Sequence, residues 1–478
     1  MNLISHITSP YFYVFNVLLL STLIILEKKR PEKTIAWIMV FVIFPPLGII
    51  LYIFLGRNWK KYKLKDQMSP YIKDLVTKVI GKVDKDEYQS LVNLLATNSE
   101  SPLFIDNDIT LFKDGYEKFE TLKAELLKAK HHIHLEYYIV KHDIIGCEIK
   151  DILIKKALEG VKVRFIIDKV GSSSLCSKYK SSLIKAGVDV VEYSYFLAPL
   201  LKFINTQINY RNHRKIVVID GIVGFLGGNN IGDEYLGNGK LGYWRDSHIM
   251  VKGDFVLGLQ SVFLDDYFTI KKANEEDLLY ENEFEKYFPS PLKGKKQVIQ
   301  LVKSGPNSEY PSIMHSILKM INIANKSIYI TTPYFVPSES VMEALKIAAL
   351  SGIDVKILFP GKYDHFIVYY ASKSYLAELL KSGVKVYLYD PKSFVHAKVI
   401  SVDGKISTIG TANIDIRSFE LNYEINAVIY DEGISKEIED MFIKDLVSSR
   451  ELTLEEYDKS PFLSRITESF MRLFSAIL

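Results

Sequence analysis

The sequence predicts an α/β protein in which two similar α/β sandwich domains follow an N-terminal membrane anchor of transmembrane helices. Three observations lead to this fold class: two apolar runs near the N-terminus, an internal repeat of helix–strand units, and a pair of matching polar motifs within that repeat. The chain has 478 residues, enough for two or three domains. Hydrophobic residues make up 48% and charged residues 24%, as expected for a folded protein with some membrane content.

The predicted anchor occupies residues 1–65, with apolar segments over about 11–26 and 35–56. A spanning helix needs roughly 20 apolar residues, so the second segment is long enough and the first is slightly short. Basic residues follow each segment, and aromatic side chains such as Trp37 lie near the segment ends, as at bilayer interfaces. Because no clear cleavage site follows the first segment, we expect an uncleaved anchor rather than a signal peptide.

The membrane topology of the second segment is not decided by the sequence, because Pro45, Pro46 and Gly48 interrupt the apolar run. We favour a kinked span in a spanning hairpin; a re-entrant segment is the alternative, and buried helices of a soluble protein fit the basic flanks less well. The chain is therefore predicted to be a multi-pass protein of the cell membrane, with the domains that follow the anchor on the cytoplasmic side. Its two cysteines, Cys147 and Cys176, lack the spacing of a zinc site or a disulfide framework.

After a predicted linker at 66–105, the chain repeats itself. In each copy the end of a helix meets a glycine and then a β-branched strand. The matching pieces are residues 157–165 with 349–357 and residues 183–188 with 379–384. Strands that alternate with helices at this spacing predict an α/β sandwich, built twice. We expect a first domain over 106–290 and a second over 291–478, packed about a pseudo-twofold axis.

Two matching polar motifs lie at corresponding points of the repeat. Each reads His-x-Lys-x4-Asp and is followed by a Gly-containing turn that ends in an Asn seventeen residues after the His. The members are His213, Lys215, Asp220 and Asn230 in the first half, and His396, Lys398, Asp403 and Asn413 in the second. One such motif could arise by chance, but a pair with matched Gly and Asn positions indicates a shared function.

The residue types in these motifs suit chemistry on a phosphate group. Each His and its Lys project together, because residues two apart in a strand face the same side. An imidazole can attack phosphorus or protonate a leaving alkoxide near neutral pH, while Lys and Asn side chains can hold phosphate oxygens. The predicted catalytic residues are the His, Lys and Asp of both motifs, and the predicted substrate-binding residues are Asn230, Thr411 and Asn413.

Further carboxylates accompany the motifs. Asp246 and Glu424 follow the two motifs at comparable distances, and a carboxylate bonded to one imidazole nitrogen leaves the other free to react. We therefore predict that Asp246 and Glu424 orient the imidazoles. Asp220 and Asp403 complete the motifs, but they lie past the strand ends before a glycine turn, so a structural role is favoured over direct catalysis.

A separate histidine cluster invites a metal interpretation. His132, His134 and Glu136 share one face of a predicted strand, with His131 beside them. No further ligand set accompanies them, so packing beside the site is favoured and no metal is predicted.

The duplicated motif resembles that of the phospholipase D superfamily, whose hallmark is a pair of His-x-Lys-x4-Asp elements. The surroundings are most similar to bacterial cardiolipin synthases, in segments 209–215 and 417–424 and in the anchor around Ala36 and Trp37. The resemblance covers nearly the whole chain and is weakest from 60 to 100. Gly228 stands where many superfamily members have Ser, which would remove one hydroxyl contact to phosphate.

This resemblance implies one active site where the halves meet, working without a metal or nucleotide cofactor. One His would attack a phosphatidylglycerol, release glycerol and form a phosphatidyl-histidine. The other would protonate that glycerol and then deprotonate a hydroxyl of a second phosphatidylglycerol, giving cardiolipin. We favour His213 as nucleophile and His396 as acid/base, although sequence symmetry alone does not separate the two roles.

The alternative within the superfamily is a membrane-bound phospholipase D, with water as acceptor and phosphatidic acid as product. A net charge of +3 and two apolar anchor segments argue against a nuclease, so no nucleic acid partner is predicted. The predicted partners are phosphatidylglycerol and membrane lipids, and the sequence indicates no oligomeric state. A membrane-tethered scaffold is disfavoured because both motifs are complete.

Two apolar stretches have open roles. Residues 193–209, just before the first motif, contain an apolar insertion that could enter the bilayer or pack against the other half. The C-terminal stretch places apolar residues such as Phe462 and Phe470 at helical spacing. Core packing is favoured there over an interfacial helix, because Arg465 and Arg472 supply few charges for the opposite face.

Overall fold

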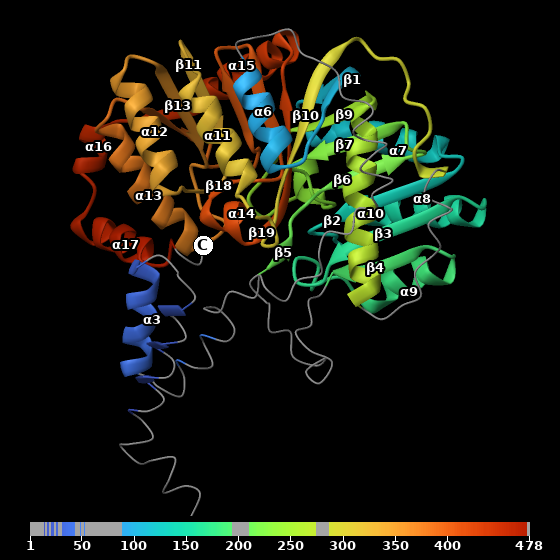
Figure 1. Ribbon diagram of the computed structural model, residues 1–478, viewed down its shortest axis with the longest axis horizontal. Coiled ribbons are helices and arrows are strands. Elements are labelled where there is room, and N and C mark those ends of the chain that lie inside the picture. The colour runs from blue at the N-terminus through green and yellow to red at the C-terminus, as the bar shows by residue number, and fades with distance from the viewer. Residues whose placement is uncertain are drawn as a thin grey trace, which may run out of the picture. The chain divides into compact units, whose positions relative to one another are not determined.

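The computed structural model describes residues 31–43, 88–193, 210–273 and 286–475, together with isolated positions between 14 and 52. The chain divides into two compact units, one of residues 1–65 and 194–210 and one of residues 66–193 and 211–478. The larger unit contains both sequence repeats (Figure 1).

The first repeat alternates strands with helices and ends in a long helix. Its elements are β1 (Leu103–Phe112), α7 (Gly115–Lys128), β2 (His132–Tyr137), α8 (Ile144–Leu158), β3 (Lys162–Asp168), α9 (Ser177–Lys185), β4 (Asp189–Tyr193), β5 (Arg211–Asn212), β6 (Ile216–Ile219), β7 (Val223–Gly227), the short 3-10 helix η5 (Asp233–Leu236), β8 (Trp244–Arg245), β9 (His248–Gly253) and α10 (Phe255–Ala273).

The second repeat has a similar succession of elements, with additional short strands and a C-terminal extension. Its elements are β10 (Gln297–Ser304), α11 (Ser312–Asn322), β11 (Ser327–Thr331), β12 (Phe335–Val336), α12 (Glu339–Leu350), β13 (Asp354–Phe359), α13 (Phe366–Leu380), β14 (Lys385–Tyr389), β15 (Phe394–Val395), β16 (Val399–Val402), β17 (Ile406–Gly410), β18 (Ile414–Asp415), α14 (Ile416–Glu420), β19 (Asn422–Ile429), α15 (Glu432–Val447), β20 (Ser449–Leu452), α16 (Leu454–Asp458) and α17 (Phe462–Arg472).

Within the described residues, strands of both repeats join into one sheet centred on the antiparallel pair β1 and β10. From this pair the order on one side is β9, β7, β6, β2, β3 and β4, and on the other side it is β19, β17, β16, β11, β13 and β14. β20 extends the second side. The two sides have corresponding strand orders about the central pair, so the prediction of two repeated α/β domains is confirmed.

The glycines that end the repeated helices lie where the sequence predicts them. Gly160 and Gly352 follow α8 and α12 with φ of +91° and +90°. Gly187 and Gly383 follow α9 and α13 with φ of +93° and +90°. A left-handed residue past a helix end favours glycine, because a Cβ would be strained there. Each glycine redirects the chain into the next parallel strand.

Helices cover the sheet and bury three large apolar clusters. One is built by α7, α8 and α9 on the first repeat, and a second by α11, α12 and α13 on the second. The third holds residues of both repeats, for example Phe255 of α10 and Ile434 of α15. Because this third cluster is shared, the repeats form one folded unit.

A helix within the predicted linker also belongs to this unit. α6 (Gln89–Asn98) buries Leu91 and Leu95 in the cluster of the second repeat, and it contacts α11 and β10. The part of 66–105 from residue 88 onward is therefore packed structure rather than a polar linker.

The smaller unit is represented by α3 (Pro31–Ile43) and a small aromatic cluster. Trp37, Phe41 and Tyr52 make this cluster, and the ring centroids of Phe41 and Tyr52 are 5.4 Å apart. In the part of the chain that the structure describes, no helix combines the length and apolar character needed to cross a membrane.

Several predicted segments fall on residues beyond those described. Much of the predicted anchor segments 11–26 and 35–56 lies outside the described residues, and so do residues 194–209 of the apolar insertion. The predictions for these segments stay predictions.

The C-terminal stretch differs from its prediction. Phe462 and Leu463 of α17 are 71% and 75% exposed, whereas Glu468 in the same helix is fully buried. The core-packing prediction for this helix is wrong, because its polar side faces the protein.

The separate histidine cluster is part of the packing. His132 and His134 are buried in β2; His132 Nε2 lies 3.1 Å from Gln260 Oε1, and Gln260 Nε2 donates to His134 Nδ1 at 2.8 Å. The His134 ring stacks on Phe263 at 4.5 Å. Burial lowers the pKa of His132 to about 4, as expected for a neutral packed imidazole.

Candidate active site

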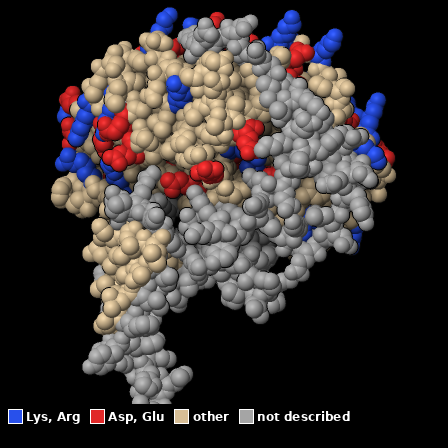
Figure 2. Space-filling model, in the orientation of Figure 1, with Lys and Arg blue, Asp and Glu red and all other residues tan. Residues whose placement is uncertain are grey.

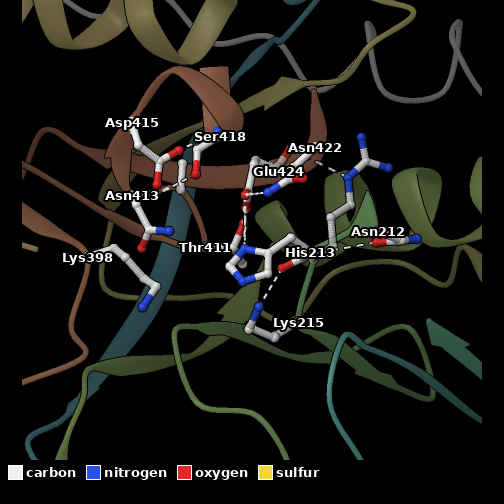
Figure 3. A network of polar contacts seen from close by, with 12 residues as sticks. Asn212, His213, Lys215, Lys398, Thr411, Asn413, Asp415, Ser418, Asn422 and Glu424 are labelled. Atoms are coloured by element: carbon white, nitrogen blue, oxygen red, sulfur yellow. Dashed lines mark hydrogen bonds and ion pairs between the residues drawn. The ribbon is translucent and has the colours of Figure 1, made fainter. Parts of the chain in front are cut away.

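The first motif is held in place by the second repeat. β5 pairs in parallel with β19, and the backbone N–H of His213 donates to the Tyr423 carbonyl at 3.0 Å. His213 Nδ1 lies 2.9 Å from Glu424 Oε1, as Figure 3 shows from close by. Since Glu424 accepts from Nδ1–H, Nε2 is the ring nitrogen that this contact leaves free.

The second motif is held by the first repeat in the same way. β15 pairs in parallel with β8, and His396 N–H donates to the Arg245 carbonyl at 2.7 Å. His396 Nδ1 lies 2.7 Å from Asp246 Oδ2. The two orienting carboxylates are thus exchanged: each repeat supplies the carboxylate for the histidine of the other. Both carboxylates are fully buried.

Two lysines support the histidine backbones. Lys215 Nζ donates to the His213 carbonyl at 2.6 Å, and Lys398 Nζ donates to the His396 carbonyl. Burial lowers the pKa of Lys215 to about 7 and that of Lys398 to about 8. An anion bound beside them would favour their charged forms, so these lysines are suited to hold a phosphate.

Both imidazoles are neutral in the ligand-free site. Burial is the main cause that lowers the pKa of His213 and of His396 to about 4, and the nearby lysines lower each pKa further. Glu424 and Asp246 act in the opposite direction. The pKa of Glu424 is itself lowered: burial, the largest single effect, opposes this shift, but His213, Lys215 and the Thr411 hydroxyl together outweigh it. A neutral imidazole with a free Nε2 is a competent nucleophile.

The two motif asparagines face the same cavity. Asn230 Oδ1 accepts from the Ile139 N–H at 3.1 Å, and its Nδ2 donates to the Tyr235 hydroxyl at 3.0 Å. Asn413 Oδ1 is buried without a hydrogen-bond partner among the described residues. Both line the cavity, so they remain candidates for substrate contacts.

Thr411 has a different place from the one predicted. Its hydroxyl donates to Glu424 Oε2 at 2.6 Å and accepts from the Ile425 N–H at 2.9 Å. It does not line the cavity. The substrate-binding prediction for Thr411 is therefore corrected: it supports the carboxylate that orients His213.

The same geometry explains Gly228, which occupies the equivalent position in the first motif. A Cβ on Gly228 would lie 2.0 Å from Asp246 Oδ1. This position thus faces an orienting carboxylate in both repeats. In the second repeat the Thr411 hydroxyl contacts Glu424, and in the first Gly228 leaves room for Asp246. The expected loss of a hydroxyl contact to phosphate does not fit this arrangement.

Asp220 and Asp403 lie at the far end of their strands. Asp220 accepts backbone N–H groups from residues 130, 131 and 132 at 2.8–2.9 Å, and Asp403 accepts those of residues 325, 326 and 327 at 2.7–2.9 Å. Both have positive φ, 53° and 56°. Their inclusion among the catalytic residues is corrected: they anchor the starts of β2 and β11, the structural role favoured from the sequence.

One cavity of about 630 Å³ is lined by His213 and His396 together. Sequence reasoning missed most of its other walls, including Tyr138 and Tyr334 just past the ends of β2 and β11, and the start of α13. Arg211 and Arg417 also line it. The carboxyl ends of parallel strands commonly build ligand sites, and this was the signal available for the two tyrosines.

No metal cluster accompanies this cavity in the part of the chain that is described: no group of three or more His, Cys, Asp or Glu is placed to hold an ion. The cavity is lined instead by two neutral imidazoles, two amides and two guanidinium groups, and Lys215 and Lys398 contact the carbonyls of the two histidines. These groups can perform a displacement at phosphorus in which one imidazole attacks and the other carries the proton.

Comparisons with known proteins agree with this geometry. A family model described as cardiolipin synthase, PLD-like domain, matches residues 122–240 and 317–446, one match in each repeat. The chain belongs to this family. A second model, described as phospholipase D-nuclease N-terminal, matches residues 14–57.

Relatives of similar length extend over nearly the whole chain. The major cardiolipin synthase ClsA of Bacillus subtilis is 43% identical, over 99% of this chain and 100% of that protein. A cardiolipin synthase of Geobacillus kaustophilus is 42% identical, over 97% and 92%. The crystal structure of phosphatidylserine synthase from Haemophilus influenzae has a TM-score of 0.63 at 17% identity, covering 81% of this chain and all of that one, which shows the shared fold.

Proposed function

We propose that this protein is a phosphatidyltransferase that joins two phosphatidylglycerol molecules into cardiolipin and releases glycerol. The observation that carries the proposal is the pair of buried histidines on one cavity, each with Nδ1 held by a carboxylate of the opposite repeat. The arrangement leaves two Nε2 atoms for one phosphorus, as a double displacement requires. The names of the relatives support cardiolipin as the product.

In the first step, His213 Nε2 attacks the phosphorus of one phosphatidylglycerol. A P–N bond forms, the P–O bond to glycerol breaks, and His396 gives its proton to the leaving oxygen. In the second step, a glycerol hydroxyl of the other phosphatidylglycerol gives its proton to His396, and its oxygen displaces His213. One phosphodiester replaces another, so no nucleotide is consumed.

The charges of the site suit this sequence. His213 must be neutral to attack, and burial keeps it so. His396 must be protonated in the first step, and the negative charge of a bound phosphodiester favours the imidazolium. Lys215 and Lys398 can stabilise charge on the phosphate oxygens as the bonds change.

We further propose a multi-pass membrane anchor over residues 1–65, with segments 11–26 and 35–56, and domains over 106–290 and 291–478. The family match at 14–57 and the basic flanks of both segments support the anchor. The net charge of +3 supports a substrate other than nucleic acid. On the face that Figure 2 shows, the Lys and Arg side chains of the described surface lie with Asp and Glu among them.

The test is product analysis by thin-layer chromatography and mass spectrometry with phosphatidylglycerol in detergent micelles. Wild type is expected to give cardiolipin and glycerol, and His213→Asn is expected to give neither. His131→Asn is the matched control, because His131 is exposed and does not line the cavity. Phosphatidic acid as the sole product would replace the proposal with a phospholipase D, and activity in His213→Asn would remove His213 from the mechanism.

A further inference from the structure

The C-terminal helix α17 has its apolar side turned away from the protein. Its large apolar residues recur at spacings that place them on one helical face. These residues, with their exposed fractions, are Phe462 (71%), Leu463 (75%), Ile466 (47%) and Phe470 (53%), continued by Leu473 (75%) and Phe474 (37%) directly after the helix. A soluble protein rarely exposes such a contiguous patch without a partner for it.

The orientation of α17 is fixed by its polar side. Glu468 is fully buried; Lys373 Nζ lies 2.8 Å from its Oε1, and the Tyr457 hydroxyl donates to its Oε2 at 2.8 Å. Arg472 pairs with Glu378 at 2.9 Å. Rotating the helix to bury its apolar face would break the ion pair between Lys373 and Glu468 and expose the Glu468 carboxylate. The exposed apolar face is therefore a stable feature.

α17 is connected to the entrance of the cavity through α13. α17 packs along α13, below it in the view of Figure 1. The first turn of α13 lines the cavity with Phe366 and Ile367, and each of these side chains is 44% exposed. The exposed apolar residues of the C-terminal helix and those at the rim of the active site are therefore connected through α13.

A cavity that receives diacyl lipids must open where those lipids are. We propose that α17 lies in the membrane interface, with its exposed apolar face among the acyl chains, and that it holds the rim formed by Phe366 and Ile367 against the bilayer. Helices that lie in a membrane interface have a strongly apolar face on one side and a polar face on the other, as α17 does. The choice of a lipid surface rests on the proposed function, whereas the orientation of α17 does not.

The test uses full-length protein in vesicles of phosphatidylglycerol and phosphatidylcholine. Cys147 and Cys176 are replaced by Ser, and a polarity-sensitive fluorophore is attached through Phe470→Cys. The matched control carries the fluorophore through Tyr116→Cys on α7, which is 56% exposed. Spin-labelled lipids are expected to quench the Phe470 probe strongly and the Tyr116 probe weakly, and a water-soluble quencher is expected to do the reverse.

Equal quenching of both probes by the water-soluble quencher would overturn the proposal. Shielding of the Phe470 probe from both quenchers would also overturn it, because the face would then be covered by protein, such as a second copy of this chain. Quenching needs no turnover, so the result stands even if the product proves to be phosphatidic acid.

A second measurement addresses activity at a bilayer. Leu463→Ser combined with Leu473→Ser is expected to keep the wild-type rate in detergent micelles and to lose activity about tenfold or more on vesicles, since two largely exposed leucines would no longer enter the membrane. The control pair is Leu127→Ser with Leu158→Ser, two exposed leucines on α7 and α8. An equal effect of both pairs on vesicles would contradict the role of α17.

Discussion

Replacing Glu424 by Gln tests the exchanged carboxylates most directly. Glu424 is fully buried and receives His213 Nδ1 at 2.9 Å, the Thr411 hydroxyl at 2.6 Å and Asn422 Nδ2 at 3.1 Å. Glutamine keeps the shape of the side chain, but it removes the charge and turns one acceptor oxygen into an NH2 group that faces a donor. The imidazole then loses the partner that fixes its tautomer.

The size of the effect follows from these contacts. A hydrogen bond to a charged group contributes about 1.5–3 kcal/mol, and about 1.4 kcal/mol corresponds to a factor of ten in rate. Loss of the tautomer control in a Ser-His-Asp triad lowers kcat about 10⁴-fold. We therefore expect kcat of Glu424→Gln to fall by about 10²- to 10⁴-fold, measured as cardiolipin formed in micelles.

The pH dependence of kcat shows how each carboxylate changes the pKa of its histidine. The Glu424 charge raises the pKa of His213, so its removal lowers that pKa. A nucleophile must be neutral, and its pKa sets the acid limb of the profile. Glu424→Gln is therefore expected to move the acid limb to lower pH, and Asp246→Asn is expected to move the alkaline limb, which belongs to the acid His396, to lower pH.

The refuting results are distinct. An acid limb that stays in place in Glu424→Gln while the alkaline limb moves would exchange the roles of the two histidines. Activity within about twofold of wild type would show that the carboxylate does not control the imidazole. Glu125→Gln is the matched control, because Glu125 is also a buried carboxylate paired with lysines, but it lies on α7 outside the cavity.

Further predictions concern single positions. Gly228→Ser is expected to lower kcat about 10²-fold with little change in KM, because its Cβ would displace Asp246; steady-state kinetics check this. Asp220→Ala is expected to lower the free energy of unfolding by about 2–4 kcal/mol and to leave kcat of the folded protein unchanged, as urea denaturation and activity would show. Arg417→Ala is expected to raise KM for phosphatidylglycerol about tenfold, with partial recovery in Arg417→Lys, since Arg417 lines the cavity and a charged contact to phosphate is lost. Finally, the pKa of His213 is near 6.5 in the unfolded chain and about 4 in the folded one. The neutral His213 therefore contributes about 3 kcal/mol to the free energy of unfolding above pH 6.5, and this contribution is lost as the pH falls toward 4. The Tm of His213→Asn should therefore fall less than that of wild type as the pH is lowered.

The fold could be predicted from the sequence because its signals are local. Gly160 and Gly352 end their helices in a left-handed conformation, and the β-branched runs after them form the parallel strands. The motif residues His213 and His396 could be found because they recur at matched positions in the repeat. These features depend on neighbours within about twenty residues.

The partners of the two histidines could not be predicted, because they come from non-local strand pairing. Glu424 reaches His213 only because β5 pairs with β19, and Asp246 reaches His396 only because β8 pairs with β15. Nothing in the spacing of Asp246 and Glu424 distinguishes a partner within the repeat from one across it. The role of Thr411 was misjudged because its hydroxyl reaches Glu424 of its own repeat through the pairing of β17 with β19, which the motif spacing does not show.

The orientation of α17 also could not be predicted. The spacing of Phe462 and Phe470 establishes an amphipathic helix, but it does not establish which side faces the protein. That choice depends on Lys373, which lies far away in sequence and offers a buried partner to Glu468.

The exchanged carboxylates explain why the site needs both repeats of the fold. Each histidine is fixed by a strand and a carboxylate of the opposite repeat, so neither repeat alone can set the tautomer of its own imidazole. The shared apolar cluster joins the repeats beside these same strands, since it includes Val399 next to the second motif and Ile425 next to Glu424. A substitution that loosens this cluster would change both imidazole–carboxylate distances together. Activity is therefore expected to be lost cooperatively with the packing of the repeats, before either repeat unfolds.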